Sequence, residues 1–444
     1  MLHDAASKWK TPFPFKRILV AVGTRAEAIK LAPLARELQE RIGSDGGPEA
    51  VVVCATGQHR DIVEETLAAF GVAVDLNLDV MMPGQTLASM SARVLSRLAQ
   101  VIAEFEPDWV VVQGGTATTA MAGLAAFYAG VRVAHVEAGL RTRDLGQPFP
   151  EEFNRRMVGI FADVHFAATE WAKNNLLREG VHEEDIVVTG NTGIDALMSH
   201  CERLGLRPDR RRPQHTGPVR VLVTAHRREN LEEGIVNLCT AIASLVTRSP
   251  GRYVFLWPLH PNPRVGEIAT AALGEQSDVL LTGPASYDEL LGYLDQCDLV
   301  LTDSGGLQEE APSFGKPVLI MREKTERPEG VRAGMAWLVG TGRERIEGAI
   351  EELAEQIAEH RTLRTPFNPY GDGFASQRIA DFFGGWPVRE FGAADERDEI
   401  PRKLPSKVPV GARDMSHDQI RDQNRDRERI RDKSRDRERI HSVS

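Results

Sequence analysis

The chain has 444 residues, 42% of them hydrophobic, so it is long enough for two domains that each have a core, and a single small module is excluded. Its net charge of −10 gives no overall field that attracts a polyanion, which argues against a nucleic-acid partner. No apolar run approaches the length of a membrane span and no signal segment is recognisable, so we expect a cytoplasmic protein with no membrane partner.

The four cysteines are far apart and lie in or beside apolar runs, as reduced, buried thiols of a cytosolic protein do. Neither a zinc-ligand spacing nor a CxxC pair occurs. The turn after the first apolar run also lacks the GxGxxG pattern of a nicotinamide or flavin site. We therefore expect neither a metal nor a cofactor.

Short apolar, β-rich runs alternate with amphipathic stretches along the whole chain. Continuous apolar runs suit strands that are buried on both faces of a parallel sheet. The runs are 18–22, 51–54, 109–112, 131–136, 165–167 and 186–189 in the first half, and 219–224, 253–257, 279–281, 299–302 and 318–321 in the second. Between them, helical periodicity is clearest at 27–41, 86–105 and 346–360. Two such βα arrays predict two Rossmann-like domains with ligands in the cleft between them.

The chain divides into three parts by composition. We expect an N-terminal domain at 16–202 and a C-terminal domain at 217–371, joined by a segment rich in Arg and Pro at 203–217. From about residue 388, apolar positions become scarce, and the decapeptide RDQNRDRERI is followed at once by RDKSRDRERI. Alternating charge with one Ile per ten residues cannot bury a core, so 388–444 is predicted to be a solvated tail, with docking through its isoleucines as the alternative.

The segment LVLTDSGGLQEE at 299–310 is a buried strand, a Ser-Gly-Gly turn and a helix start. The backbone N–H groups of Gly305 and Gly306 then lie at a helix N-terminus, where the helix dipole favours an anion such as a diphosphate. An equally weighted interpretation is that Asp303 or Ser304 only caps the helix and the glycines only shape the turn. Of the two glutamates that follow, one can accept hydrogen bonds from ribose hydroxyls while the other caps the helix or faces solvent.

The first apolar run ends in the turn GTRAEAIK at 23–30, which repeats this strand-to-helix arrangement. Arg25 and Lys30 then point toward a diphosphate or are ordinary surface charges.

The polar stretch 135–156 follows a buried strand, and a long polar loop there more often belongs to a site than to a core. His226 and His260 each follow a strand of the second domain at the same sheet edge, where a structural histidine is the commoner case.

An ordered series of motifs runs from about residue 17 to about residue 384. It reads GTRAEAIKLAPL, TGQHRDIVEETLAAFGV, HVEAGLRTRDL, PFPEEFNRR, TGNTGID, TAHRREN, LTDSGGLQEEAPSFGKPVLIMREKTERPEG and NPYGDGFAS. This series resembles that of the non-hydrolysing UDP-N-acetylglucosamine 2-epimerases. The resemblance implies the GT-B architecture, in which two Rossmann-like, doubly wound parallel-sheet domains enclose the active site. It also implies a helix at about 372–385 that crosses back to the first domain, and a homodimer.

The resemblance implies an isomerase that interconverts UDP-GlcNAc and UDP-ManNAc and so supplies precursors of cell-surface polysaccharides. UDP is eliminated to give a 2-acetamidoglucal and is then added back, with C2 protonated on the other face. By resemblance, the residues that hold the diphosphate are Arg25, Lys30, His226, Ser304, Gly305, Gly306 and Arg327, and Glu310 holds the ribose. Glu137, Glu151 and Arg155 lie around the sugar, and the residues with catalytic roles are Glu137, Glu151 and His226. An activating second UDP-GlcNAc is matched by Gln58, His59, Arg228 and His260.

One position departs from the family pattern. The strand at 109–112 runs in the family into a Gly-Asp-Thr turn whose aspartate is assigned to catalysis, whereas here Gly115 takes the aspartate's place. Glycine cannot move a proton, and losing a positioned acid or base typically costs about 10²–10⁴-fold in rate. Three interpretations stay open. Glu137 or Glu151 still performs the epimerisation, with a water in the vacated space; the site acts on another UDP-sugar or hydrolyses it; or the chain only binds.

We favour retained 2-epimerase chemistry, because the other carboxylates and the diphosphate-binding residues are present. A nucleotide-sugar sensor built on an inactive epimerase is the alternative from another functional class. A GT-B glycosyltransferase would share the nucleotide site but would need an acceptor groove.

Overall fold

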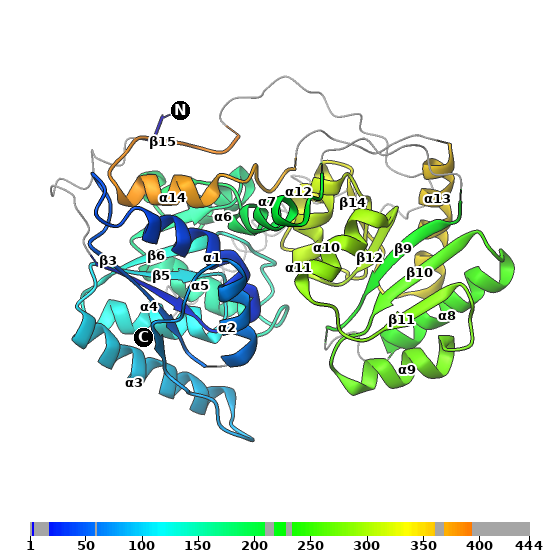
Figure 1. Cartoon of the computed structure of the whole chain (residues 1–444), viewed down its shortest axis with the longest axis horizontal. Coiled ribbons are helices and arrows are strands. Elements are labelled where there is room, and N and C mark those ends of the chain that lie inside the picture. Colours follow the sequence, from blue (N-terminus) through cyan, green and yellow to red (C-terminus); the bar gives the residue numbers. More distant parts are fainter. Residues whose placement is uncertain are drawn as a thin grey trace, which may run out of the picture.

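The structure is a computed structural model that describes residues 2–3, 17–57, 60–208, 217–227, 233–359 and 368–392. These residues form two lobes that lie side by side (Figure 1), each built on a parallel sheet. Helices cover the sheets, so the strands are buried on both faces and read as continuous apolar runs. The predicted class, two doubly wound α/β domains, is confirmed.

The sheet of the N-terminal lobe has seven strands in the order β4-β3-β2-β5-β6-β7-β8. Its strands are β2 (Arg17–Val22), β3 (Ala50–Ala55), β4 (Leu76–Asn77), β5 (Trp109–Gln113), β6 (Arg132–Ala138), β7 (Val164–Ala167) and β8 (Ile186–Val188). Its helices are α1 (Arg25–Glu40), α2 (Arg60–Ala69), α3 (Leu87–Phe105), α4 (Ala117–Tyr128), α5 (Glu151–Phe161), α6 (Glu170–Arg178) and α7 (Thr192–Leu204). The strand order changes direction at β2, which pairs with β3 on one side and β5 on the other. A crevice for ligands is expected at the carboxyl ends of β2 and β5.

The sheet of the C-terminal lobe has six strands in the order β11-β10-β9-β12-β13-β14. Its strands are β9 (Val219–Thr224), β10 (Tyr253–Pro258), β11 (Val279–Thr282), β12 (Leu299–Thr302), β13 (Val318–Ile320) and β14 (Ala336–Leu338). Its helices are α8 (Glu233–Arg248), α9 (Pro263–Leu273), α10 (Tyr287–Gln296), α11 (Gly305–Glu310), α12 (Pro328–Arg332) and α13 (Arg343–Ala358). Here the order changes direction between β9 and β12, so the second crevice lies where these two strands end.

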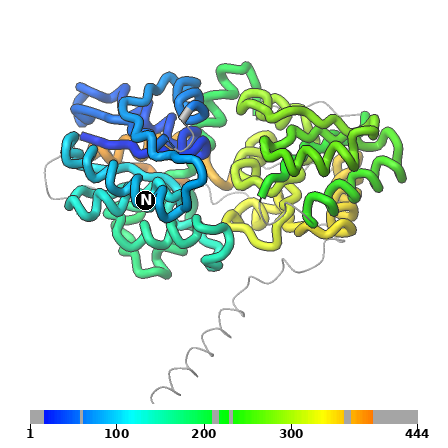
Figure 2. Tube along the Cα trace, turned by 90° about the horizontal axis from the view of Figure 1, so that it is seen from below, coloured from blue at the N-terminus to red at the C-terminus, as the bar shows by residue number. Residues whose placement is uncertain are grey.

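After the second lobe the chain returns to the first. Helix α14 (Ala375–Phe383) packs against α1 and α7, and the orange C-terminal segment lies with the blue lobe in both Figure 1 and Figure 2. Beyond it, β15 (Val388–Arg389) pairs with β1 (Leu2–His3) in an antiparallel arrangement. Because Val388 and Phe391 are buried, the predicted start of the tail at residue 388 is wrong by a few residues. The charged repeat itself lies outside the described residues.

The return helix should carry part of the stability of the N-terminal lobe. Phe382 is buried and meets Trp109 edge to face, with ring centroids 6.2 Å apart. We expect Phe382→Ala to lower the free energy of unfolding by about 3–5 kcal/mol, since it removes a buried ring and leaves a cavity. Urea titration measures this change. The control is Phe374→Ala at the exposed N-cap of the same helix, which should change stability by less than about 1 kcal/mol. An equal loss in the free energy of unfolding in Phe382→Ala and Phe374→Ala would contradict this role of the return helix.

The four cysteines are buried and form no disulfide. Burial raises the pKa of Cys54, Cys201 and Cys239 to about 12, so these thiols stay protonated and unreactive. Across the described ranges, no helix is both long and apolar enough to cross a membrane. Among the same residues, no cluster of three or more His, Cys, Asp or Glu side chains is placed to hold a metal ion.

Candidate active site

The site lies where the two crevices face each other across the lobes. Helix α1 follows β2 and carries Lys30, whereas α11 follows β12 and carries Glu309. The Nζ atom of Lys30 is 2.9 Å from Oε2 of Glu309, so an ion pair joins the two sheet edges. Both side chains are almost fully buried. The two strand-to-helix turns identified in the sequence therefore meet at one place.

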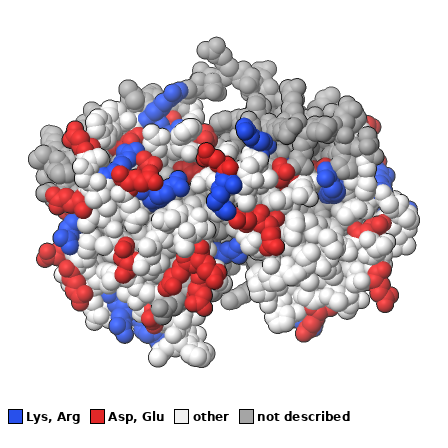
Figure 3. Space-filling model, in the orientation of Figure 1, with Lys and Arg blue, Asp and Glu red and all other residues white. Residues whose placement is uncertain are grey.

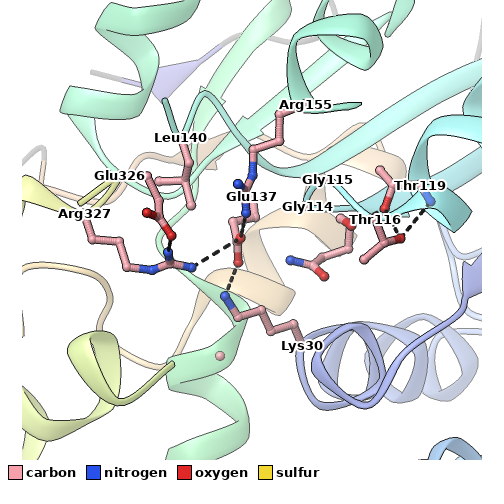
Figure 4. Close-up of polar contacts among 12 residues, drawn as sticks. Lys30, Gly114, Gly115, Thr116, Thr119, Glu137, Leu140, Arg155, Glu326 and Arg327 are labelled. Atoms are coloured by element: carbon pink, nitrogen blue, oxygen red, sulfur yellow. Dashed lines mark hydrogen bonds and ion pairs between the residues drawn. The ribbon is translucent and has the colours of Figure 1, made fainter. Parts of the chain in front are cut away.

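A cluster of buried charges forms the centre of the site (Figure 4). Lys30 also contacts Glu137, and Arg327 donates from Nε to Glu309 at 2.5 Å while its Nη2 lies 3.8 Å from Glu137. Arg327 pairs with Glu326 as well. Burial opposes the charge on Lys30, but Glu137 and Glu309 outweigh it and hold the pKa of Lys30 above its ordinary value. The cluster thus keeps its cations charged away from water, as binding of an anionic ligand requires.

Glu137 reaches the cluster through an irregularity of its strand. The pairing of β6 with β7 shifts between Val136 and Ala138, and Glu137 adopts φ +60, a left-handed conformation that is uncommon outside glycine. Strain of this kind, of order 1–3 kcal/mol, persists where the surrounding structure enforces it. Burial alone would raise the pKa of Glu137, but Lys30, Arg327 and Arg155 hold it below its ordinary value. Glu137 is therefore an ionised carboxylate aimed into the cleft.

The turn before α11 has the form of an anion cradle. Ser304 is the N-cap residue, but its side chain makes no capping hydrogen bond. Asp303 does not cap the helix either, because its carboxylate accepts the backbone N–H groups of His226 and Arg227. A Cβ on Gly305 would lie only 2.9 Å from Nη1 of Arg327, so glycine is what lets this guanidinium cover the turn. These contacts favour the diphosphate cradle over simple capping.

The expectation that one of the two glutamates on α11 caps the helix or faces solvent is wrong. Glu309 is buried in the ion cluster with Lys30 and Arg327. Glu310 is also buried, and its Oε1 accepts a hydrogen bond from the hydroxyl of Tyr287 at 3.1 Å. Burial raises the pKa of Glu310 to about 7, despite the hydrogen bond from Tyr287 that opposes the rise.

His226 stands at the carboxyl end of β9. Its Nδ1 lies 3.3 Å from Oδ1 of Asp303, and its ring stacks on that of His260, with centroids 5.1 Å apart and planes 11° apart. The Asp303 contact orients the imidazole and leaves its Nε2 for a ligand. The pKa of His260 is lowered, mainly because the ring is partly buried and to a smaller extent because His226 lies beside it. His260, predicted for the activator site, is thus a direct neighbour of His226.

Helix α5 brings residues that are predicted to lie around the sugar close to Gly115. Asn154 donates from Nδ2 to the carbonyl of Gly115 at 2.9 Å, and Nη2 of Arg155 lies 3.6 Å from Glu137. A Cβ on Gly115 would lie 2.5 Å from the carbonyl oxygen of Glu151 and 2.6 Å from Cγ of Arg155. The position that a Cβ would take at residue 115 is therefore already occupied by the first turn of α5.

The structure places the remaining predicted residues less centrally. Arg25 is the exposed first residue of α1, and its charge acts on Glu310. Gln58, His59 and Arg228 lie outside the described residues. Sequence reasoning missed Glu309 and Glu326 as members of the ion cluster. The only available signal for Glu326 was its place beside Arg327 in the TERPEG motif.

The face of the protein shown in Figure 3 is not dominated by charges of one sign. Acidic and basic side chains are mixed on this face, including along the boundary between the lobes. The strongly organised charge of the protein is instead the buried cluster around Lys30 and Arg327. Recognition of an anion therefore depends on this local site rather than on a long-range field.

Comparison with known proteins identifies the family. The family model described as UDP-N-acetylglucosamine 2-epimerase matches residues 46–384. The UDP-N-acetylglucosamine 2-epimerase of Salmonella typhimurium is 43% identical over 371 residues, which cover 82% of this chain and 97% of the relative. The crystal structure of the Neisseria meningitidis UDP-GlcNAc 2-epimerase bound to UDP-GlcNAc matches with a TM-score of 0.76 and 41% identity, covering 82% of this chain and 98% of that one. The Methanocaldococcus jannaschii UDP-GlcNAc 2-epimerase in complex with UDP-GlcNAc and UDP matches with a TM-score of 0.69 and 31% identity, with the same coverage. The chain therefore belongs to the UDP-N-acetylglucosamine 2-epimerases, a family of isomerases.

Proposed function

We propose that this protein interconverts UDP-GlcNAc and UDP-ManNAc. The observation that carries the proposal is the buried ion cluster, in which Lys30 from one lobe and Arg327 from the other meet beside the α11 turn. A diphosphate bound there accepts hydrogen bonds from Arg327 and from the turn at Gly305, and the sugar extends toward Glu137. The relatives bound to UDP-GlcNAc support the same substrate.

The proposed reaction eliminates UDP and adds it back. A carboxylate, Glu137 or Glu151, takes the proton from C2 of the sugar. The C–H electron pair becomes the C1=C2 double bond, and UDP leaves with the electron pair of the C1–O bond. Arg327, Lys30 and His226 stabilise the charge that grows on the departing diphosphate. Reprotonation of C2 on the opposite face and attack of UDP oxygen on C1 complete the epimerisation.

The decisive experiment is proton NMR of UDP-GlcNAc, and separately of UDP-ManNAc, incubated with the protein in D₂O. We expect deuterium to enter C2 of both sugars as they interconvert. Binding without exchange would identify a sensor, and free sugar as the end product would identify a hydrolase. Release of UDP only when an acceptor is supplied would identify a glycosyltransferase. Each of these three results would overturn the proposal.

Binding of UDP should depend on pH through Glu310. Its pKa of about 7 in the free protein should fall on binding, because ribose hydroxyls donate hydrogen bonds to the ionised carboxylate. Binding then releases a proton, so affinity should fall up to tenfold per unit as pH drops below 7 and should level off above it. Calorimetry from pH 5 to 8 measures this dependence. In Glu310→Gln, the affinity for UDP should no longer vary with pH through this carboxyl and should follow only the titration of the terminal phosphate of UDP. An unchanged pH dependence of the affinity would contradict the role of Glu310 in ribose binding.

We also infer a homodimer, on the basis of an apolar surface on the N-terminal lobe. Tyr128 at the end of α4 is 71% exposed and Ile160 on α5 is 85% exposed. Beside them in sequence, the rings of Phe127 and Phe161 contact each other, with centroids 5.6 Å apart. Large exposed apolar side chains grouped in this way fit association with a second copy. Sedimentation analysis should find a dimer that Ile160→Glu converts to a monomer.

The proposed setting is the cytoplasm, where four buried cysteines that form no disulfide would stay reduced. There the reaction would supply an activated sugar for cell-surface polysaccharide. Activation by a second UDP-GlcNAc near His260 remains part of the proposal. A sigmoidal dependence of the rate on UDP-GlcNAc concentration that becomes hyperbolic in His260→Ala would support this activation.

A further inference from the structure

Gly115 stands at the closest contact between two parts of the site. A Cβ at this position would come within 2.5 Å of the carbonyl oxygen of Glu151, an approach that real Cβ atoms essentially never make. The contact is with backbone, so no side-chain rotation can relieve it. The second contact, 2.6 Å from Cγ of Arg155, lies near the root of a buried side chain. The absence of a side chain at residue 115 is therefore what permits this packing.

The first turn of α5 is fixed from both sides in this position. Asn154 binds the carbonyl of Gly115 at 2.9 Å. Glu152 is fully buried, and its carboxylate accepts the backbone N–H groups of Thr142 and Arg143 at 3.1 and 3.0 Å. To admit a Cβ, the turn must move as a unit, and it would carry Glu151 and Arg155 with it.

Glu137 on β6 and the two glutamates that begin α5 differ in what already holds their carboxylates. Glu137 is bound by Lys30 and flanked by Arg155 and Arg327, and the lowered pKa that results makes it a weak base. Glu152 is committed to backbone N–H groups. Glu151 is only partly buried, and no hydrogen bond or ion pair of its side chain occurs among the described residues. Of the three, Glu151 is the one whose carboxylate no described protein group holds, so it is left to act on the substrate.

We propose that Gly115 is a positioning residue whose missing side chain lets α5 close onto the β5–α4 turn, so that Glu151 supplies the carboxylate that the family pattern places at position 115. The inference rests on the proposed epimerase function. Glu151 takes the C2 proton as the C–H electron pair forms the C1=C2 bond and UDP departs. Among the residues that the structure describes, Nε and Nη1 of the buried Arg155 have no hydrogen-bond partner, so they are left to the acceptor atoms of the sugar.

The test compares Gly115→Asp with Gly115→Ala, and both with Glu151→Gln. We expect the aspartate not to restore a catalytic group but to lower C2 deuterium exchange by about 100-fold, because a misplacement of about 1 Å costs that much. Alanine should do the same, since the Cβ alone causes the clash. Gly348→Ala on α13 is the matched control, because a Cβ there meets nothing within 4 Å, and it should leave exchange unchanged.

The affinity for UDP separates positioning from misfolding. Lys30, Arg327 and the α11 turn lie outside α5, so UDP should bind both Gly115 variants within about threefold of the wild type while exchange is lost. Glu151→Gln removes no packing and should abolish exchange in a folded protein, and Gly115→Asp combined with it should restore nothing. Faster exchange in Gly115→Asp, normal exchange in Gly115→Ala, or retained exchange in Glu151→Gln would each overturn the inference. Absence of exchange in the wild type would instead overturn the proposed function.

Discussion

Replacement of Arg327 by leucine should lower the affinity for UDP at least 100-fold. The guanidinium is buried against Gly305 and bonded to Glu309, at the point where the diphosphate is proposed to bind. A hydrogen bond to a charged group contributes about 1.5–3 kcal/mol, so two lost to one diphosphate correspond to about 100-fold or more. Calorimetry with UDP measures the change. The affinity of Arg327→Lys for UDP should lie between those of the wild type and Arg327→Leu, because lysine keeps the positive charge but lacks the planar guanidinium with its paired N–H donors.

The same substitution should also destabilise the protein. Without Arg327, the buried carboxylates of Glu309 and Glu326 each lose a cation, and breaking a buried ion pair costs about 3–5 kcal/mol. The control is Arg264→Leu, which removes an exposed pair with Glu267 and should cost less than about 1 kcal/mol. Unfolding measured alongside calorimetry separates lost folding from lost binding. Normal affinity for UDP in folded Arg327→Leu would show that the diphosphate binds elsewhere.

Replacement of Glu137 by glutamine should slow epimerisation by about 10²–10³-fold, through loss of an electrostatic contact, and leave UDP binding intact or stronger. Glu137 contacts Lys30 and lies near Arg155 and Arg327 in the structure. Removal of its negative charge frees these cations for the diphosphate, so affinity should not fall. The sugar, however, loses the ionised carboxylate that faces it from β6 and that would stabilise positive charge growing at C1 as the C–O bond to UDP breaks. The kinetic signature is a loss in kcat without a loss in affinity.

Rates of C2 exchange and calorimetric affinities, measured on the same samples, test this split. Glu323→Gln removes an exposed carboxylate that pairs with Arg345 and should affect neither quantity. A parallel fall in affinity and rate would mean that Glu137 acts by holding the cluster together, and the catalytic role would be abandoned.

The sequence predicted the sheets well because the strands are buried on both faces. Each predicted apolar run forms a strand, and several family motifs, such as GTRAEAIKLAPL, TGNTGID and LTDSGG, fall at the carboxyl ends of those strands. The strands that were not predicted, among them β4 at Leu76–Asn77 and β14 at Ala336–Leu338, are too short to show a run. The family, and with it the two-domain architecture, was also determined by sequence, because an ordered series of motifs is specific where single motifs are not.

Only the tertiary structure decided which charged groups meet. Glu309 and Glu310 are adjacent in sequence, yet one joins Lys30 from the other lobe and the other faces Tyr287. Neighbouring residues on a helix point about 100° apart, and sequence does not say what lies in either direction. The same holds for Gly115: the sequence shows that a carboxylate is missing, but α5 fills its place through a contact between residues 36 positions apart. Local pattern specifies the elements, whereas the site is made by contacts between them.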